Sequence, residues 1–293
     1  MRITSGAVTA AIDPLGAELA SITDATGREW MTDADPAYWA GRAPLLFPIV
    51  GALAGGAYRL DGRTYALPQH GFARRRGFDL VEATAATARF RLIDDAQTRA
   101  VYPFAFALEM AFALEEMRLT MTATIENRGD RAMPASFGYH PAFAWPLPGG
   151  GEKTAHRLVF DAAEGPIHAI EGGLIGGALP GPVVDRTLAL DDALFARDAL
   201  VWDAIASRSL RYEGDGAALT VGWDAPMLGV WSKPGARFVC VEPWWGHADP
   251  VGFAGDIVDK PGMMRIAPGE RRDCAMWVQL ADGPPLSPHA NPE

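Results

Sequence analysis

The stretch YPFAFALEMAFAL, residues 102–114, carries a large apolar side chain at every second position. This alternation is typical of a β-strand with one buried face, or of two strands separated by a bend. It does not fit the 3.6-residue period of a helix. The stretch LTMTATIEN, residues 119–127, repeats the pattern with threonine on the other face, and NRGD at 127–130 supplies a turn. Together they predict β structure in the middle of the chain.

Strand signals continue on both sides of this region. Residues 88–92 and 219–223 alternate in the same way, and Asp61-Gly62 separates two short alternating runs, as in a β-hairpin. Helix signals are few, and only residues 191–200 are expected to form a short turn of helix. The chain has 32 glycines and 23 prolines among 293 residues, an excess that predicts many tight turns.

The segment 146–181 is rich in glycine and proline and interrupts this rhythm. We interpret it as a long excursion within one large β-sandwich rather than as a linker, because strands of similar type flank it. The sequence thus predicts an all-β protein with few short helices. A single domain is expected over residues 1–282, followed by a frayed tail at 283–293.

Charge and cysteine content narrow the classes of partner. With 26 basic and 36 acidic residues the formal net charge is −10, which argues against nucleic acid or an anionic membrane as the main partner. No stretch approaches the roughly 20 apolar residues that a membrane-spanning helix requires. The two cysteines, Cys240 and Cys274, are too few for a disulfide framework, so we expect a reduced, cytoplasmic protein.

Several common catalytic motifs are absent from the sequence. It has no Gly-x-x-x-x-Gly-Lys phosphate loop, no Gly-x-Ser-x-Gly nucleophile elbow and no His-Glu-x-x-His zinc motif. It has no His-x-His pair either, and His247-x-Asp249 alone is more typical of a solvated loop than of a metal site. The sequence therefore predicts neither a cofactor nor a metal.

Two arginine-bearing segments stand out among those rich in proline, glycine and aromatic residues. In GRAPLLFP, residues 41–48, Arg42 abuts an apolar run, so its head either reaches water or enters a polar cleft. In QHGFARRR, residues 69–76, His70 precedes a glycine, where a ligand can approach the backbone. The three arginines that follow, Arg74 among them, either grip an anion such as a sugar phosphate or solvate a turn.

Two further segments carry a histidine and a carboxylate. In SFGYHPAF, residues 136–143, a strand would place His140 on the same face as small residues, which clears space beside it. In FVCVEPWWG, residues 238–246, Glu242 shares a face with Cys240 and precedes two tryptophans. A carboxylate at the end of an apolar strand destabilises the folded state unless it is paired or exposed to solvent. We interpret this segment as the floor of an aromatic-walled cleft suited to a sugar, or else as a rim glutamate beside core tryptophans.

These segments, in this order, resemble the aldose 1-epimerase (galactose mutarotase-like) superfamily, and most closely its LacX-like branch near the hexose-6-phosphate mutarotases. The resemblance covers nearly the whole chain. It is carried by DPLGAEL (13–19), YW (38–39), LFPIVG (46–51), QHGFAR (69–74), YPF (102–104), HPAF (140–143), DALV (198–201) and EPW (242–244).

The resemblance implies a large antiparallel β-sandwich with a sugar site on one face. It implies that His140 is the catalytic acid and Glu242 the catalytic base, and that His70 contacts the sugar near the reacting centre. Anomer interconversion needs only such a pair, because a base takes the anomeric hydroxyl proton while an acid protonates the ring oxygen. Cys240 is expected to pack behind the carboxylate without a chemical role.

The resemblance also implies substrate-binding residues. Arg42 matches the family's substrate-binding arginine, and Asp198 matches the aspartate that holds sugar hydroxyls, with Asp203 as a competing candidate. Arg74 belongs to the motif of the phosphate-favouring branch. Arg75 departs from the acidic or polar residue expected after it, which puts a preference for phosphate in question.

The predicted function is that of a cofactor-independent mutarotase acting on a hexose. Three alternatives stay open: a hexose-6-phosphate mutarotase, a non-catalytic sugar-binding protein, and a glycoside hydrolase using Glu242 with Asp198 or Asp249. The last would leave His140 without a role. The sequence does not specify the sugar, the anomeric preference or the oligomeric state.

Overall fold

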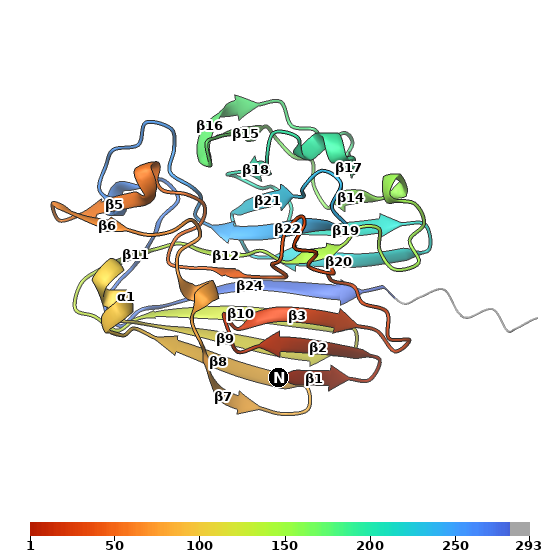
Figure 1. The fold of residues 1–293 in the computed structure, drawn as a ribbon, viewed down its shortest axis with the longest axis horizontal. Coiled ribbons are helices and arrows are strands. Elements are labelled where there is room, and N and C mark those ends of the chain that lie inside the picture. The colour runs from red at the N-terminus through yellow and green to blue at the C-terminus, as the bar shows by residue number, and fades with distance from the viewer. Residues whose placement is uncertain (282–293) are drawn as a thin grey trace, which may run out of the picture.

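Two large antiparallel sheets contain most of the strands in the computed structural model of the protein, which describes residues 1–281 (Figure 1). The predicted all-β sandwich is therefore confirmed. The predicted tail at 283–293 lies outside the described residues. The domain boundaries expected from the sequence stay a prediction.

The larger sheet has nine strands and includes the alternating stretches that open the sequence argument. In spatial order its strands are β17 (Thr187–Ala189), β14 (Arg157–Phe160), β19 (Ser209–Gly214), β20 (Ala217–Trp223), β24 (Arg271–Leu280), β10 (Arg118–Asn127), β9 (Phe106–Glu115), β8 (Thr87–Ile93) and β7 (Asp79–Ala83).

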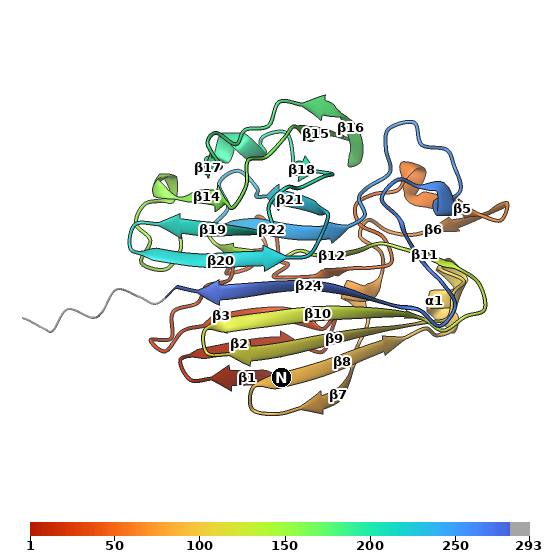
Figure 2. The ribbon, with the colours of Figure 1, turned by 180° about the vertical axis from the view of Figure 1, so that it is seen from behind.

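The smaller sheet has eight, mostly short, strands. In spatial order they are β16 (Leu174–Leu179), β15 (Ile167–Glu171), β18 (Leu200–Trp202), β21 (Met227–Trp231), β22 (Phe238–Trp245), β12 (Phe137–Tyr139) and β4 (Leu45–Leu46), and β13 (Ala142–Ala144) also pairs with β22. Figure 2 shows the two sheets from behind, with β24 and β10 of the larger sheet in view.

Smaller elements complete the described part of the chain. A three-stranded sheet of β1 (Arg2–Ser5), β2 (Val8–Asp13) and β3 (Glu18–Thr23) lies over the larger sheet (Figure 1). Two-stranded sheets join β5 (Ala57–Leu60) to β6 (Arg63–Ala66) and β11 (Met133–Ala135) to β23 (Met264–Ile266). The helices are α1 (Ala96–Val101) and the 3-10 turns η1 (Ala54–Gly56), η2 (Ala73–Arg75), η3 (Lys153–Ala155), η4 (Asp192–Phe195) and η5 (Ile257–Asp259).

The alternating stretches form strands as predicted. In β10 every second residue from Leu119 onward is buried, and β9 pairs with it over ten residues. The predicted hairpin at Asp61-Gly62 also forms, with both residues at positive φ, between β5 and β6. The alternation at 102–114 predicts a strand from Tyr102 onward. In the structure Tyr102 is the C-cap residue of α1, and the strand β9 begins at Phe106.

Two segments contain more regular structure than the sequence indicated. The segment 146–181 belongs to the sandwich, as interpreted, and it contains η3 and the strands β14, β15 and β16. Its glycines and prolines lie largely between these short elements. The helix α1 was not expected, although Asp95 and Thr98 form a capping box that marks its start. The predicted helical turn within 191–200 is present as η4.

The main hydrophobic core lies between the two large sheets. It combines Met121 and Met276 of the larger sheet with Tyr139, Val241 and other residues of the smaller one. The Tyr139 hydroxyl donates a hydrogen bond to the Cys274 carbonyl oxygen at 2.9 Å, which ties one sheet to the other. No helix within residues 1–281 is long and apolar enough to cross a membrane.

Candidate active site

Strand β22 has two buried faces with different surroundings. Val239, Val241 and Trp245 belong to the main core, as the alternation requires. The opposite face carries Cys240, Glu242 and Trp244, so the predicted placement of Glu242 with Cys240 is confirmed. The two tryptophans therefore do not both wall a cleft. Trp244 lies on the face of Glu242, whereas Trp245 packs against Phe137 and Tyr139 in the core.

His140 reaches this face from the end of the neighbouring strand. Phe137 and Tyr139 of β12 point into the main core, and Gly138 lies on the other side. A Cβ atom at Gly138 would come within 2.7 Å of the Trp244 indole. A side chain at position 138 would therefore collide with the Trp244 ring.

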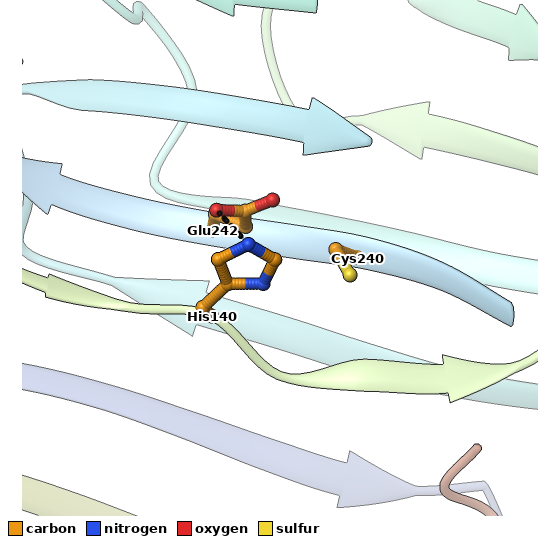
Figure 3. A group of neighbouring side chains, drawn as sticks. All are labelled: His140, Cys240 and Glu242. Carbon is orange, nitrogen blue, oxygen red and sulfur yellow. Dashed lines mark ion pairs between the residues drawn. The ribbon is translucent and has the colours of Figure 1, made fainter. Parts of the chain in front are cut away.

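The central feature of the site is a direct contact between these two side chains. His140 Nε2 lies 3.3 Å from Glu242 Oε2, and the dashed line in Figure 3 marks this ion pair. Both residues are buried, with 7% of His140 and 1% of Glu242 exposed. His140 Nδ1 has no hydrogen-bond partner among the described residues. The pair can therefore exchange a proton within itself and present the same two groups to a small ligand.

Burial pushes both members of the pair toward their uncharged forms. It raises the pKa of Glu242 well above its usual range; the Trp244 indole N–H opposes this rise and the Asp198 carboxylate adds to it. Among residues 1–281 the Trp244 N–H finds no acceptor in good hydrogen-bond geometry, so it compensates the carboxyl only weakly. Burial and the charge of Arg74 lower the pKa of His140 to about 3, although its own backbone works against them.

Aromatic rings fix the orientation of His140. Trp39 stacks on the imidazole at 4.9 Å between ring centroids and an angle of 26°. Trp231 meets it edge-on at 5.8 Å. Sequence reasoning gave neither tryptophan a role. The only local signal is Gly41, where a Cβ would come within 2.4 Å of the Trp39 ring.

His70 lies next to His140, as its predicted role requires. The two imidazole centroids are 5.8 Å apart. His70 has a positive φ of 65°, and its Nδ1 accepts a hydrogen bond from the Gly51 N–H at 3.1 Å. The proton of neutral His70 is therefore on Nε2, which is free to donate. Burial, His140 and Arg74 lower the pKa of His70 well below its usual range, so it stays neutral.

The two predicted arginines differ in their surroundings. The guanidinium of Arg74 donates a 2.8 Å hydrogen bond to the Gln69 carbonyl oxygen, and its charge lowers the pKa of both His140 and His70. The backbone carbonyl of Arg42 accepts a hydrogen bond from Ala142 N. Its guanidinium, however, donates to the carbonyl oxygen of Thr32 at 2.6 Å. None of the side-chain hydrogen bonds of Arg42 joins it to the catalytic pair.

The competing aspartates lie in different environments. Asp198 is exposed and lines a cleft together with Gln69 and Trp244. Its negative charge contributes to the raised pKa of Glu242. Asp203 is paired with His168, whose Nε2 lies 3.0 Å from its Oδ2. Asp198 thus lines the same cleft as Trp244, whereas Asp203 is engaged by His168.

Asp249, the other carboxylate considered as a partner of Glu242, is engaged elsewhere. Its Oδ1 lies 3.0 Å from the Lys260 ammonium and its Oδ2 accepts from Ala54 N, and both members of this ion pair are buried. This arrangement ties the 247–260 loop to η1. It leaves His140 as the ionisable group in contact with Glu242.

The antiparallel β-sandwich of two large sheets places the chain in the class of galactose mutarotase-like folds. The chain belongs to the aldose 1-epimerase family, whose family model matches residues 1–262. This confirms the resemblance inferred from the sequence motifs.

Relatives cover almost the whole chain. Protein LacX, chromosomal, from Lactococcus lactis subsp. lactis is 32% identical over 269 residues, which are 87% of this chain and 90% of that protein. The galactose mutarotase related enzyme from Lactobacillus acidophilus superposes with a TM-score of 0.91 at 31% identity and 97% coverage of both chains. A galactose mutarotase-like protein from Lactobacillus casei ATCC 334 superposes with a TM-score of 0.89 at 27% identity, over 96% of this chain and 99% of that chain.

Proposed function

We propose that the protein is an aldose 1-epimerase that interconverts the α and β anomers of a hexose. The observation that carries the proposal is the buried 3.3 Å contact of His140 with Glu242, on the strand face that also carries Trp244 of the neighbouring cleft. A sugar-binding protein has no need of two ionisable groups held together at such a desolvation cost. A two-carboxylate hydrolase would leave His140 unused.

In the proposed reaction Glu242 takes the proton of the anomeric hydroxyl while His140 protonates the ring oxygen. The C1–O5 bond breaks, the free aldehyde rotates about C1–C2, and the ring recloses with both proton transfers reversed. Each positioned proton transfer typically contributes about 10²- to 10⁴-fold. Indole faces suit the C–H face of a sugar, so Trp244 supplies a wall for the ring.

Burial disfavours the charged pair of Glu242 carboxylate and His140 imidazolium from which this reaction starts. The neutral pair, Glu242 carboxylic acid with His140 imidazole, holds as many protons as the carboxylate with the imidazolium. Proton movement across the 3.3 Å contact converts one into the other without exchange with solvent. The neutral pair is also the state that ring opening leaves behind. The pKa shifts of both groups favour that state.

We propose a free or broadly tolerated aldose as the substrate. Arg42 and Arg74 each use part of their guanidinium on backbone carbonyls, and the net charge of −10 disfavours anionic ligands. The positive charge of Arg74, which lowers the pKa of both histidines, supports the alternative of a hexose 6-phosphate. We further propose a reducing, cytoplasmic location, which agrees with two free buried cysteines.

The test is polarimetry over a panel of free and 6-phosphorylated aldoses, each started from one pure anomer, with EDTA present. We expect protein-dependent acceleration for at least one sugar and no loss of rate from the chelator. Sugar binding without acceleration for any member of the panel would refute the enzymatic proposal and favour a binding protein.

A further inference from the structure

Cys240 places a third metal-binding group beside the catalytic pair. One ring nitrogen of His140, Sγ of Cys240 and one carboxylate oxygen of Glu242 all lie within 4.8 Å of one another (Figure 3). The strand geometry explains this arrangement. Cys240 precedes Glu242 by two residues on the same face of β22, and it pairs across the sheet with Ala142, two residues beyond His140.

The three groups are buried and have little else to bind. Cys240 is a free thiol with no exposed surface, and His140 Nδ1 has no hydrogen-bond partner in the described part of the chain. His140 is also the ion-pair partner of Glu242. Within residues 1–281 this is the one group of three such side chains that converges closely enough to hold an ion.

The donor set matches a thiophilic d¹⁰ cation. Zinc takes thiolate sulfur at about 2.3 Å, imidazole nitrogen at about 2.0–2.1 Å and carboxylate oxygen at about 2.0–2.2 Å, and it accepts three protein ligands plus water. Ligands on one such ion lie roughly 3–4 Å apart, so a small movement of the Cys240 side chain suffices. Mg²⁺ and Ca²⁺ require oxygen ligands and do not fit this set.

The geometry points to an inhibitory site for Zn²⁺ or Cd²⁺ formed by His140, Cys240 and Glu242. Binding displaces the thiol proton and the carboxyl proton into solvent, and the imidazole contributes a lone pair. The ion then occupies the two groups that a sugar needs. Metal binding itself does not depend on the proposed mutarotase activity, whereas inhibition rests on it.

The direct test is binding of the metal alone to the whole protein. Titration with Co²⁺ as a spectroscopic stand-in for Zn²⁺ should give a thiolate-to-metal absorption band, and calorimetry with Zn²⁺ should give one tight site. Cys240→Ala should abolish the band and weaken Zn²⁺ binding at least about tenfold. The matched control is Cys274→Ala, which removes an equally buried thiol from β24 of the larger sheet and should bind as wild type does.

Activity provides an independent readout. Without metal, Cys240→Ala should keep most of the wild-type mutarotation rate, and its inhibition by Zn²⁺ should be at least about tenfold weaker. Should Cys240→Ala not fold, Cys240→Ser, which removes the soft ligand at almost constant volume, replaces it.

The outcomes separate the two proposals. Equal Zn²⁺ affinity in wild type and in the Cys240 variant, or no thiolate band with Co²⁺, would overturn the metal site whatever the activity. A band that depends on Cys240 in a protein without mutarotase activity would support the metal site and refute the proposed function.

Discussion

The two large sheets use the same strand geometry for different purposes. In β10 of the larger sheet, buried residues alternate with half-buried threonines, and the central residues of the strand form no part of the site. In β22 of the smaller sheet all eight residues are buried, including Glu242. A strand covered on both faces has no solvent-facing side for polar residues. A carboxylate in such a strand therefore weakens folding, which makes it a strong candidate for a functional group.

The largest expected effect comes from neutralising the buried carboxylate. Glu242→Gln should lower kcat at least about 10²-fold while sugar still binds, because the amide keeps the shape but cannot take a proton. His140→Asn should behave similarly. Sugar binding is measured by calorimetry and kcat by polarimetry.

The matched control for that change is Glu109→Gln in β9. Glu109 is half-buried and accepts from Arg91 at 2.9 Å on the larger sheet. Its replacement should leave kcat unchanged. Nearly wild-type turnover in Glu242→Gln would show that Glu242 is not the base. It would also show that a glutamate in the smaller sheet matters no more for turnover than Glu109 in the larger sheet.

Truncating a core side chain should lower stability in either sheet but should affect activity only in the smaller sheet. Leu108→Ala in β9 empties a site with no exposed surface and should lower the free energy of unfolding by about 2–5 kcal/mol without changing kcat. Leu46→Ala in β4 should cost a similar amount. Because Leu46 packs with Trp244, its loss should also raise KM. Denaturant titration and initial rates on both variants test this prediction, and a fall in kcat for Leu108→Ala alone would contradict it.

The aspartates at either end of β18 provide a smaller, paired comparison. Asp198→Ala should raise KM about tenfold or more, because a hydrogen bond to a charged group contributes about 1.5–3 kcal/mol. Asp203→Ala removes an exposed partner of His168 and should leave KM nearly unchanged. Steady-state kinetics of both variants measure KM. A larger rise in KM for Asp203→Ala than for Asp198→Ala would identify Asp203 as the substrate-holding residue.

Arg74 tests the substrate class, with a still smaller effect expected. For a broadly tolerated aldose, Arg74→Ala should change the ratio of kcat/KM for phosphorylated over free hexose by less than about tenfold. A preference of tenfold or more for the 6-phosphate in wild type, lost in the variant, would identify the protein as a hexose-6-phosphate mutarotase instead.

The pH dependence should show no effect of His140 where histidines ordinarily titrate. Because the pKa of His140 is lowered from 6.5 to about 3, the imidazole stays neutral until the pH falls far below 6.5. The pKa of Glu242 is shifted in the opposite direction, upward from its usual range. Hence His140 should contribute no inflection of kcat near 6.5, and its nitrogen NMR shifts should stay those of a neutral ring. An imidazolium signal at neutral pH in the free protein would contradict this expectation.

Local alternation predicted much of the fold and one face of the site. It placed Phe137 and Tyr139 opposite His140, and Val241 opposite Glu242, as the structure confirms. The same alternation assigns Trp244 and Trp245 to opposite faces, yet both sequence interpretations, the aromatic-walled cleft and the pair of core tryptophans, treated the two residues alike. Trp245 lies in the core.

The remaining features depend on contacts between distant segments. The pairing of Gly138 with Trp244 brings the ends of β12 and β22 together, and no local pattern fixes a register across more than about a hundred residues. The stacking of Trp39 on His140 has the same origin. The roles of His140 and Glu242 could be inferred only from a family resemblance, because a histidine and a glutamate at such separation carry no local motif.

The most direct test of the account is exchange NMR between the α and β anomers of a free hexose at equilibrium, with wild type, His140→Asn and Glu242→Gln, in EDTA. The account predicts accelerated exchange with wild type, and a rate at least about 10²-fold lower for either variant after the spontaneous rate is subtracted. Exchange with wild type no faster than in buffer, for every sugar that binds, would contradict it.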